Sequence, residues 1–256
     1  MSEDAGAWAS GDVRPSQADG NLPSVLDVLV ETFEDFREHF AGYILAGLGV
    51  WLVMFPIVLV GIIGVFALMA AAAAPGIMAN DEDLIFMGAM AAYIGGLCLL
   101  MLITACIVPP LQASVGRAML ERISAGADLT IGAAFSTWRM DMFKVIGTYL
   151  LVQFIVIVAM LFCYIPGLIA VFLTGLAIPA VIVHRLAPMA AVQLSVKHAM
   201  EHPTWHLGYF AITMGISMVL MYIPLIGPAL MISFLLSFQL RCYTAVFGLG
   251  SEPEWA

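Results

Sequence analysis

The sequence predicts an all-α polytopic membrane protein, with six transmembrane helices arranged as three hairpins. The 256 residues are 62% hydrophobic and only 11% charged, and the mean hydropathy is +1.03, values that lie outside the range of soluble domains. Four long stretches contain no charged residue and no histidine. All nine Lys and Arg residues fall in segments that six spans place on one side of the membrane.

The N-terminal segment is polar, acidic and rich in Gly, Ser and Pro, and it lacks the basic-then-apolar pattern of a cleaved signal peptide. We expect a disordered acidic cytoplasmic tail over 1–23, a membrane domain over 24–249 and a short cytoplasmic tail over 250–256. Residues 1–38 hold nine acids and two bases, which is −7 of the formal net charge of −9. This balance excludes a basic surface for nucleic acid.

The apolar stretches account for six spans. They cover 41–80, 85–116, 145–183 and 207–240, and each exceeds the roughly 20 residues that cross about 30 Å of hydrocarbon. As one helix the third stretch would be about 58 Å long, and Pro166 interrupts it at the middle; Pro224 interrupts the fourth in the same way. The predicted spans are therefore 43–73, 84–108, 145–165, 167–184, 206–223 and 225–247.

Charge placement gives the orientation of these spans. The loop 74–83 and the tight turns hold no base, whereas all nine bases fall on or near the other side of the membrane. Six lie in the loops 109–144 and 184–206, two (Arg14 and Arg37) precede the first span, and Arg241 is near the end of the sixth. Cytoplasmic loops collect Lys and Arg. We therefore predict that both the N- and C-termini are cytoplasmic.

Each hairpin is predicted to follow a cytoplasmic interfacial amphipathic helix. Before the first, third and fifth spans, apolar residues recur at spacings of three and four, which puts each set on one helical face. The three sets are Val25, Leu29, Phe33, Phe36 and Phe40; Ile131, Phe135, Trp138 and Met142; and Met189, Val192, Val196 and Met200. The last two hairpins share the motif Tyr-Ile-Pro, at 164–166 and 222–224, so we predict three repeated units, each an interfacial helix followed by a hairpin. A further interfacial helix at about 110–124 would join the first unit to the second. The alternative is a set of ordinary amphipathic linkers with a Tyr-Ile-Pro motif repeated by chance.

The helix predicted before the first span also carries five carboxylates, which we assign to the face opposite its apolar stripe. They are Asp27, Glu31, Glu34, Asp35 and Glu38. An anionic inner leaflet repels such a face, so we expect this helix to dock on protein. Exposed ion pairs contribute only about 0 to 1 kcal/mol each, so burial of Leu29, Phe33 and Phe36 is expected to supply most of the docking energy.

Five short motifs resemble those of a bacterial superfamily of multi-pass proteins. They are Pro-x-x-x-x-x-Gly-Arg (110–117), Gly-Ala-Ala-Phe (132–135), Tyr-Ile-Pro-Gly-Leu (164–168), Ile-Pro-Ala-Val-Ile-Val (178–183) and Ala-Val-Gln-Leu-Ser (191–195). Over about residues 24–249 the chain resembles the YciC-like proteins and the membrane domain attached to some glycerophosphodiester phosphodiesterases. The resemblance implies a six-helix protein of the bacterial cytoplasmic (inner) membrane, and it implies no reaction.

Reactive residues form no catalytic pattern. No Asp or Glu lies within a predicted span, which disfavours proton- or sodium-coupled transport, and there is no catalytic triad or phosphate-binding glycine loop. His198 and His202 stand at a spacing that two metal ligands can use, but capping of membrane helices explains them equally well. The four cysteines are interpreted as small apolar residues. We therefore predict no catalytic residue, no metal and no cofactor.

Few polar residues remain within the spans. Gln153 lies near the middle of the third span, and Ser233, Ser237 and Arg241 form a stripe on the sixth with Gln239 beside it. These five residues are the candidate ligand or lipid site. In one interpretation the stripe lines a cavity or binds an anionic headgroup; in the other, Arg241 snorkels to the cytoplasmic boundary and the hydroxyls join helices.

The function predicted from these features is that of a non-enzymatic integral inner-membrane protein that organises lipid or partner proteins through its interfacial helices. The alternative is a small uncoupled transporter or lipid-handling protein that uses the Gln153/Arg241 region. The predicted partners are the lipid bilayer and either a second copy of the chain or another membrane protein, with no nucleic acid.

Small residues on the second and fifth spans permit close helix approach within or between subunits. They are Gly88, Ala92, Gly96, Ala211 and Gly215.

Overall fold

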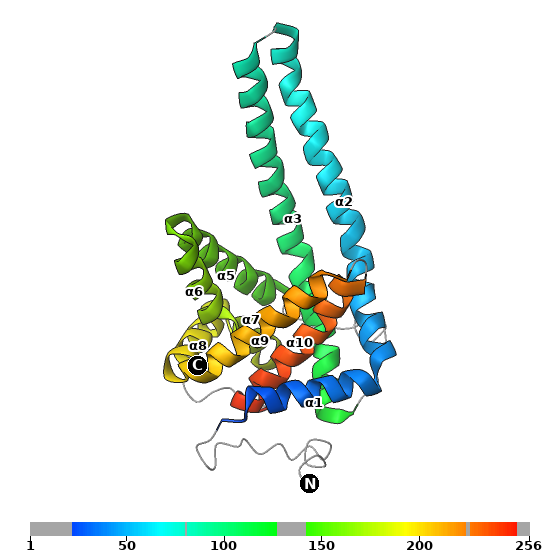
Figure 1. Ribbon diagram of the computed structural model, residues 1–256, viewed down its shortest axis with the longest axis vertical. Coiled ribbons are helices and arrows are strands. Elements are labelled where there is room, and N and C mark those ends of the chain that lie inside the picture. Colours follow the sequence, from blue (N-terminus) through cyan, green and yellow to red (C-terminus); the bar gives the residue numbers. More distant parts are fainter. Residues whose placement is uncertain (1–21, 80, 127–141, 224–225, 250–256) are drawn as a thin grey trace. The chain divides into compact units, whose positions relative to one another are not determined.

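The computed structural model describes residues 22–79, 81–126, 142–223 and 226–249, and every regular element in these ranges is a helix (Figure 1). The helices are α1 (Val25–Glu38), α2 (Phe40–Ala79), α3 (Glu82–Ala125), α5 (Met142–Phe162), α6 (Tyr164–Thr174), α7 (Ala177–His184), α8 (Pro188–Glu201), α9 (Pro203–Met221) and α10 (Ile226–Phe247). Six helical segments are long and apolar enough to cross a membrane, with α6 and α7 counted as one. The prediction of an all-α multi-pass membrane protein is confirmed at this level.

The chain divides into two compact units, and the smaller one covers residues 51–108. It contains most of α2 and the first part of α3, which lie side by side (Figure 1). A Cβ atom added at Gly88 would overlap the carbonyl oxygen of Ala72, and one at Gly96 would press on Val65. Such close contact at small residues is typical of membrane helices, because van der Waals packing drives their association.

The α3 helix differs from the prediction at its C-terminal part. A span ending at 108 and a separate interfacial helix over about 110–124 were expected, but α3 runs without a break through Pro109 and Pro110 to Ala125. Each proline removes one amide donor from the helix ladder. Membrane helices tolerate this loss where neighbouring groups satisfy the freed carbonyls. The boundary between the two units falls at Pro109.

The larger unit comprises residues up to Val50 and from Pro109 onwards, and α10 lies at its centre. The α10 helix contacts α1, α7 and α9, while α5 packs against α6, α7 and α8 (Figure 1). Phe238, Leu240 and Tyr243 are fully buried. Because α10 has protein on several sides, its polar residues have to find partners within the unit.

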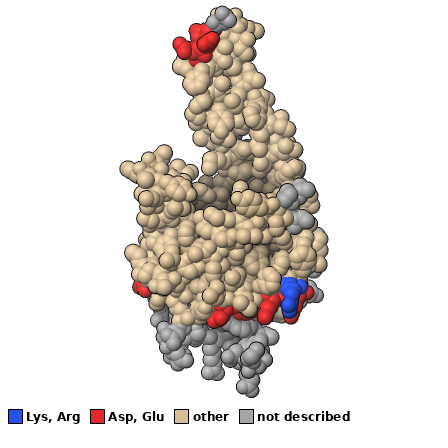
Figure 2. All heavy atoms as spheres, in the orientation of Figure 1, with Lys and Arg blue, Asp and Glu red and all other residues tan. Residues whose placement is uncertain are grey.

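The described charged residues have a restricted distribution. Figure 2 shows acidic residues on the smaller unit at the turn between α2 and α3, and charged residues of the larger unit along one edge, where α1 lies. The rest of the visible described surface of each unit carries no Lys, Arg, Asp or Glu. Helices that face lipid require such a surface, because a charge in hydrocarbon is costly.

Two of the predicted amphipathic helices lie wholly or largely within the described residues. In α8 the buried residues include Ala191, Leu194 and His198, whereas Met189 and Met200 of the predicted apolar stripe are exposed, so the buried face differs from the predicted one. The stripe over 131–142 lies outside the described residues except for Met142, and so do the tails over 1–21 and 250–256. The three-unit repeat therefore stays a prediction.

The backbones of α2 and α10 approach closely at Gly47 within the larger unit. A Cβ atom added there would overlap the carbonyl oxygen of Ala229. We therefore expect Gly47→Ala to destabilise the protein by about 1–3 kcal/mol, because the two helices have to move apart. Thermal unfolding in detergent measures the effect. Gly95→Ala is the control, since nothing lies within 4 Å of its added Cβ; equal melting temperatures for the two variants would contradict the contact.

Candidate functional site

The predicted site residues on α10 lie on two different faces of the helix. Ser233, Ser237 and Arg241 follow one another at intervals of four and share one face. Gln239 is two residues from Arg241, which is about 200° around a helix of 3.6 residues per turn. The structure therefore separates the five candidates into two sites, one around Arg241 and one around Gln239 and Gln153.

Arg241 forms ion pairs with α1. Its Nη1 lies 2.6 Å from Oε1 of Glu31, and its Nη2 lies 2.9 Å from Oδ2 of Asp35. Arg122, near the end of α3, places its Nη2 3.0 Å from Oδ1 of the same aspartate. The Arg241, Arg122 and Asp35 side chains are only 11%, 9% and 15% exposed. Two carboxylates thus balance two guanidinium groups in a largely buried cluster.

Hydroxyl groups extend this Arg241 cluster toward α2. The Tyr43 hydroxyl donates to Oδ2 of Asp35 at 2.5 Å and lies 3.0 Å from Oγ of Ser237. Ser233 donates to the carbonyl of Ala229 in its own helix, at the point where Gly47 of α2 approaches. The stripe on α10 therefore joins α10 to α1 and α2, as the structural interpretation of these residues predicts, and Arg241 pairs with protein carboxylates.

The environment of the cluster moves the pKa values of its two acids in opposite directions. Burial raises the pKa of Glu31, because it outweighs the opposing attraction of Arg241. Burial alone would also raise the pKa of Asp35, but the hydrogen bonds from Tyr43 and Arg122 and the charge of Arg241 lower it overall. Asp35 is therefore the acid that the folded protein holds most firmly in its charged form.

The α1 helix docks on protein as predicted, but through different residues. Its buried residues are Val25, Val28 and Thr32, on the side that carries Asp35, whereas Phe33 is 56% exposed. The prediction that Phe33 would be buried at the docking surface, with Glu31 and Asp35 on the opposite face, was wrong. The acids turn inward because Arg122 and Arg241 offer them partners.

The surface of α1 therefore divides into three sides. One side faces protein, a second exposes apolar residues and a third exposes acidic residues. The exposed apolar side carries Leu26, Val30 and Phe33, and the exposed acidic side carries Asp27, Glu34 and Glu38.

The second site is a cavity of about 370 Å³ in the larger unit. Three glutamines from different helices line it: Gln112 of α3, Gln153 of α5 and Gln239 of α10. We call it the amide cavity. Tyr149 and Thr174 add hydroxyl groups, and the remaining lining is apolar apart from the Gly175 backbone: Val152, Val156, Val171, Ile178, Met231, Ile232, Leu235 and Leu236.

The amide cavity lies at a break in the fourth span. A single helix over 167–184 was predicted, but α6 ends at Thr174 and α7 begins at Ala177. Residues on both sides of the break, including Thr174 and Ile178, line the cavity. Pro179 provides a reason for the break, because it has no amide hydrogen to donate to the carbonyl of Gly175 four residues earlier.

Ser195 of α8 is the hydrogen-bond partner of two backbone groups at this break. Oγ of Ser195 accepts a hydrogen bond from the Leu176 amide at 3.0 Å and donates one to the Leu173 carbonyl at 2.7 Å. Backbone polar groups at membrane depth have to be paired within the protein, because lipid offers no partner. One serine therefore serves both ends of the interrupted helix.

Two residues of α9 complete the support of the break. The Tyr209 hydroxyl donates to the Gly175 carbonyl at 3.0 Å, which is the acceptor that Pro179 leaves free. Nε2 of His206 lies 2.7 Å from the Phe172 carbonyl, and the carbonyl can only accept, so the histidine donates. The break is held by a set of specific contacts from neighbouring helices.

The chemistry of the amide cavity is polar but uncharged. No Asp, Glu, Lys, Arg or His is among the residues that line it. Each glutamine offers both a carbonyl acceptor and an NH₂ donor. In the described part of the chain, none of the three amides hydrogen bonds to another side chain or to the backbone. The site can therefore bind hydroxyl or amide groups of a ligand.

The predicted metal-ligand candidates His198 and His202 lie in a group of packed aromatic rings. The His198 ring lies 5.0 Å from that of His202 and 5.2 Å from that of Trp205, measured between ring centroids. Burial, together with the neighbouring His206 and His202, lowers the pKa of His198 to about 4, so this ring is neutral at physiological pH. Among the described residues, no group of three or more His, Cys, Asp or Glu side chains is arranged to hold a metal ion.

Several residues of both sites were not identified from the sequence. Glu31 and Asp35 are four residues apart on one helical face, and Arg241 was the only charge inside a predicted span; a membrane charge generally pairs with another charge. Those two facts together could have suggested the Arg241 cluster. Gln112 was missed because its segment was assigned to an interfacial helix.

No family model matches this chain, and neither the curated proteins nor the solved structures compared with it give a match. The resemblance to the YciC-like superfamily stays a prediction.

Proposed function

We propose that this chain is a non-enzymatic multi-pass membrane protein that handles lipid or a lipid-like molecule, and that the amide cavity binds the uncharged polar group of that molecule. The observation that carries the proposal is the convergence of Gln112, Gln153 and Gln239 beside a broken membrane helix. An unsatisfied polar group in hydrocarbon costs several kcal/mol, so amides that face a cavity at membrane depth call for a polar partner.

The break in the fourth span supports the same proposal. Irregular backbone at membrane depth is tolerated where it is buried in protein or lines a cavity, and in many transporters such breaks lie at the substrate site. Here Thr174 and Ile178, on either side of the break, line the cavity. The contacts of Ser195 and Tyr209 hold that backbone in position, so the cavity has a preformed wall.

The lining also defines the class of ligand. Three amides and two hydroxyls suit hydroxyl or amide groups, whereas Val152, Val156 and Met231 suit a hydrocarbon portion. No carboxylate or cation lines the cavity, so the proposal includes no proton- or sodium-coupled step. An uncharged amphiphile fits this combination better than an ion or a charged headgroup does.

The test is binding of monooleoylglycerol, which has two hydroxyls and one acyl chain and no charge. The protein is reconstituted in phosphatidylcholine nanodiscs, and the dissociation constant is measured by calorimetric titration. In the double variant Gln153→Leu/Gln239→Leu the Kd should rise about tenfold, because two hydrogen bonds of about 0.5–1.5 kcal/mol each are lost.

Gln193→Leu is the matched control, because Gln193 is an exposed glutamine of α8. Its Kd should equal that of the wild type. Oleate, with the same chain and a carboxylate, should bind more weakly than monooleoylglycerol. Equal affinity of the double variant and the wild type, with both proteins folded, would refute the site.

A second candidate function, in which α1 organises lipid or partner proteins at the interface, is favoured by the two exposed sides of that helix.

We further propose that the six spans form three hairpins, each after an interfacial helix, in the bacterial inner membrane with both termini cytoplasmic. The one-sided distribution of the nine Lys and Arg residues and the resemblance in the sequence support this arrangement.

A further inference from the structure

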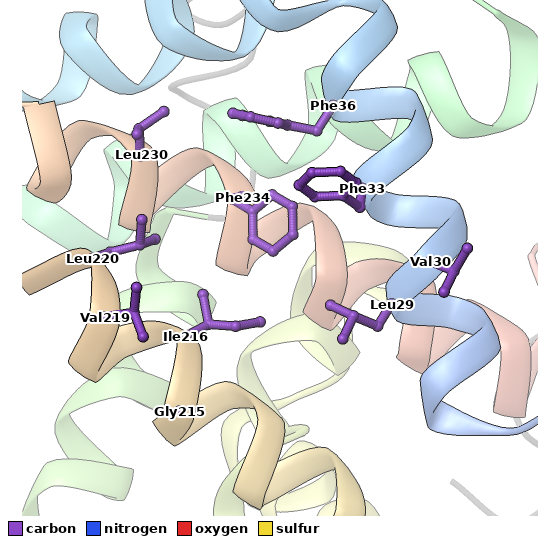
Figure 3. Close-up of a pocket in the computed structure, with 10 residues that line it drawn as sticks. All are labelled: Leu29, Val30, Phe33, Phe36, Gly215, Ile216, Val219, Leu220, Leu230 and Phe234. Carbon is purple, nitrogen blue, oxygen red and sulfur yellow. The ribbon is translucent and has the colours of Figure 1, made fainter.

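A second concave surface lies between α1, α9 and α10, on a different face of α10 from the amide cavity (Figure 3). Its volume is about 530 Å³. All of its lining residues are apolar: Leu29, Val30, Phe33, Phe36, Gly215, Ile216, Val219, Leu220, Leu230 and Phe234. We call this surface the apolar groove.

Aromatic rings form part of the floor of the groove, and a hydrogen bond joins α1 to α9 near their N-terminal ends. Phe33 and Phe36 of α1 lie across from Ile216 of α9, with Phe234 of α10 between them (Figure 3). The Phe36 and Phe234 rings pack edge to face, with centroids 5.3 Å apart. At the N-terminal ends of α1 and α9, Nε1 of Trp205 donates to the Pro23 carbonyl at 2.8 Å and holds the two walls together.

The groove is continuous with surface that faces the bilayer. Two of its walls, α9 and α10, are membrane spans by length and hydropathy. Three of its lining residues, Val30, Phe33 and Val219, are themselves exposed, and Met218 of α9 is exposed beside it. Hydrocarbon from the surrounding lipid therefore reaches the groove without crossing a polar barrier.

The size of the groove suits a hydrocarbon chain better than a helix. A helix with side chains is about 10 Å across and rises about 5.4 Å per turn, so the groove holds little more than one turn. A span from a second copy is several turns long, so it would lie over the open side of the groove and not within it. A flexible hydrocarbon chain fits, because it is narrow and can follow the floor.

A cation lies on the correct side of α1 for a lipid headgroup. Arg37 is exposed and stands four residues after Phe33, so it shares the exposed apolar side. It is the only base in α1, and the exposed acids Asp27, Glu34 and Glu38 lie on another side. A long basic side chain at the end of an apolar face can reach the phosphate level of a bilayer.

We propose that the apolar groove holds one acyl chain of a phospholipid from the surrounding bilayer, with the phosphate of that lipid at Arg37. This site is independent of the amide cavity, since the two share no lining residue.

Photocrosslinking tests the proposal. The whole protein is reconstituted in nanodiscs that contain phosphatidylcholine with a diazirine in the middle of one acyl chain, and the crosslinked peptides are identified by mass spectrometry. Crosslinks are expected on α1 and α9. In Gly215→Leu they should fall about tenfold, because the leucine displaces two or three methylenes worth about 0.8 kcal/mol each. Nothing lies within 4 Å of a Cβ added at Gly215, so a larger side chain there begins in open space.

Gly95→Leu is the matched control, because its added Cβ also has open space and Gly95 lies in the other unit. Its crosslinking should not change. If Gly215→Leu fails to fold, Ile216→Trp fills the same groove. Arg37→Gln should weaken crosslinking by the phosphatidylcholine probe but not by diacylglycerol with the same diazirine. Undiminished crosslinks in a folded groove-filling variant would overturn the proposal. A photoreactive amino acid in place of Ile216 that crosslinks to a second copy of the chain would also overturn it.

Discussion

In the variant Asp35→Ala, amide hydrogen exchange across Val25–Glu38 is expected to accelerate at least about 100-fold. Asp35 accepts hydrogen bonds from Tyr43, Arg122 and Arg241, and its side chain is largely buried. Removing one partner of a buried ion pair costs about 3–5 kcal/mol, because the other charge is left uncompensated, and every 1.4 kcal/mol is a factor of ten. Exchange of the detergent-solubilised protein, read by mass spectrometry, measures the effect.

Glu34→Ala is the control, because it removes the same charge from the exposed side of the same helix. Its α1 amides should exchange at the wild-type rate, since an exposed charge contributes little. If Asp35→Ala also left the exchange unchanged, docking of α1 would not depend on the ion pairs of Asp35.

The lowered pKa of Asp35 determines how the stability of the folded protein changes with pH. The folded protein binds fewer protons at this site than the unfolded chain does, so the stabilisation is present above the unfolded-state pKa of the carboxyl. It is lost as the pH falls through the lowered folded-state value. The raised pKa of Glu31 acts in the opposite sense, because its charged form is disfavoured in the folded state.

Ser195→Ala is expected to destabilise the protein by about 2–4 kcal/mol, because the Leu176 amide and the Leu173 carbonyl both lose their partner and a buried unsatisfied group costs about 1–3 kcal/mol. Both groups lie at the break beside the amide cavity, so binding of monooleoylglycerol should weaken together with stability. Thermal unfolding in detergent and the nanodisc titration measure the two effects.

Ser217→Ala is the matched control, because Ser217 bonds only to the carbonyl of Thr213 in its own helix. That carbonyl lies within α9, so losing the hydroxyl should change the melting temperature little. Ser195→Thr keeps the hydroxyl and should retain most of the stability. Equal losses in Ser195→Ala and Ser217→Ala would mean that the break does not depend on the Ser195 bridge.

The number of spans could be predicted because it depends on local properties of the sequence. Long uncharged stretches identify the helices that cross lipid, and Pro166 together with the length of its stretch indicates a turn near the middle. The structure has α5 ending at Phe162 and α6 beginning at Tyr164, close to that expectation. The second such turn includes Pro224, which lies outside the described residues.

The break between α6 and α7 was not predicted because its signal is indirect. Pro179 stands inside an apolar run, and a proline there can kink a helix or occupy the first turn of a new one. Only the contacts of Ser195, His206 and Tyr209, which come from α8 and α9, favour the second arrangement. The sequence alone does not show which distant side chains reach this backbone.

The two sites were merged for a related reason. Helical periodicity puts Gln239 and Arg241 on opposite faces, but the sequence does not say which neighbour covers each face. Their charge predicts that Glu31 and Asp35 are exposed. This prediction fails because the folded protein offers both acids a buried counterion. Gln153 was identified because a lone polar residue at mid-span stands out in an apolar sequence.

The ion pair between Glu31 and Arg241 links residues that are 210 positions apart in the chain. A ribosome that adds about 5–20 residues per second needs roughly 10–40 s to synthesise that interval. During this time Glu31 has no Arg241 to pair with, whereas Asp35 can pair with Arg122 once α3 has been made. Docking of α1 against α10 can therefore occur only after α10 has been synthesised.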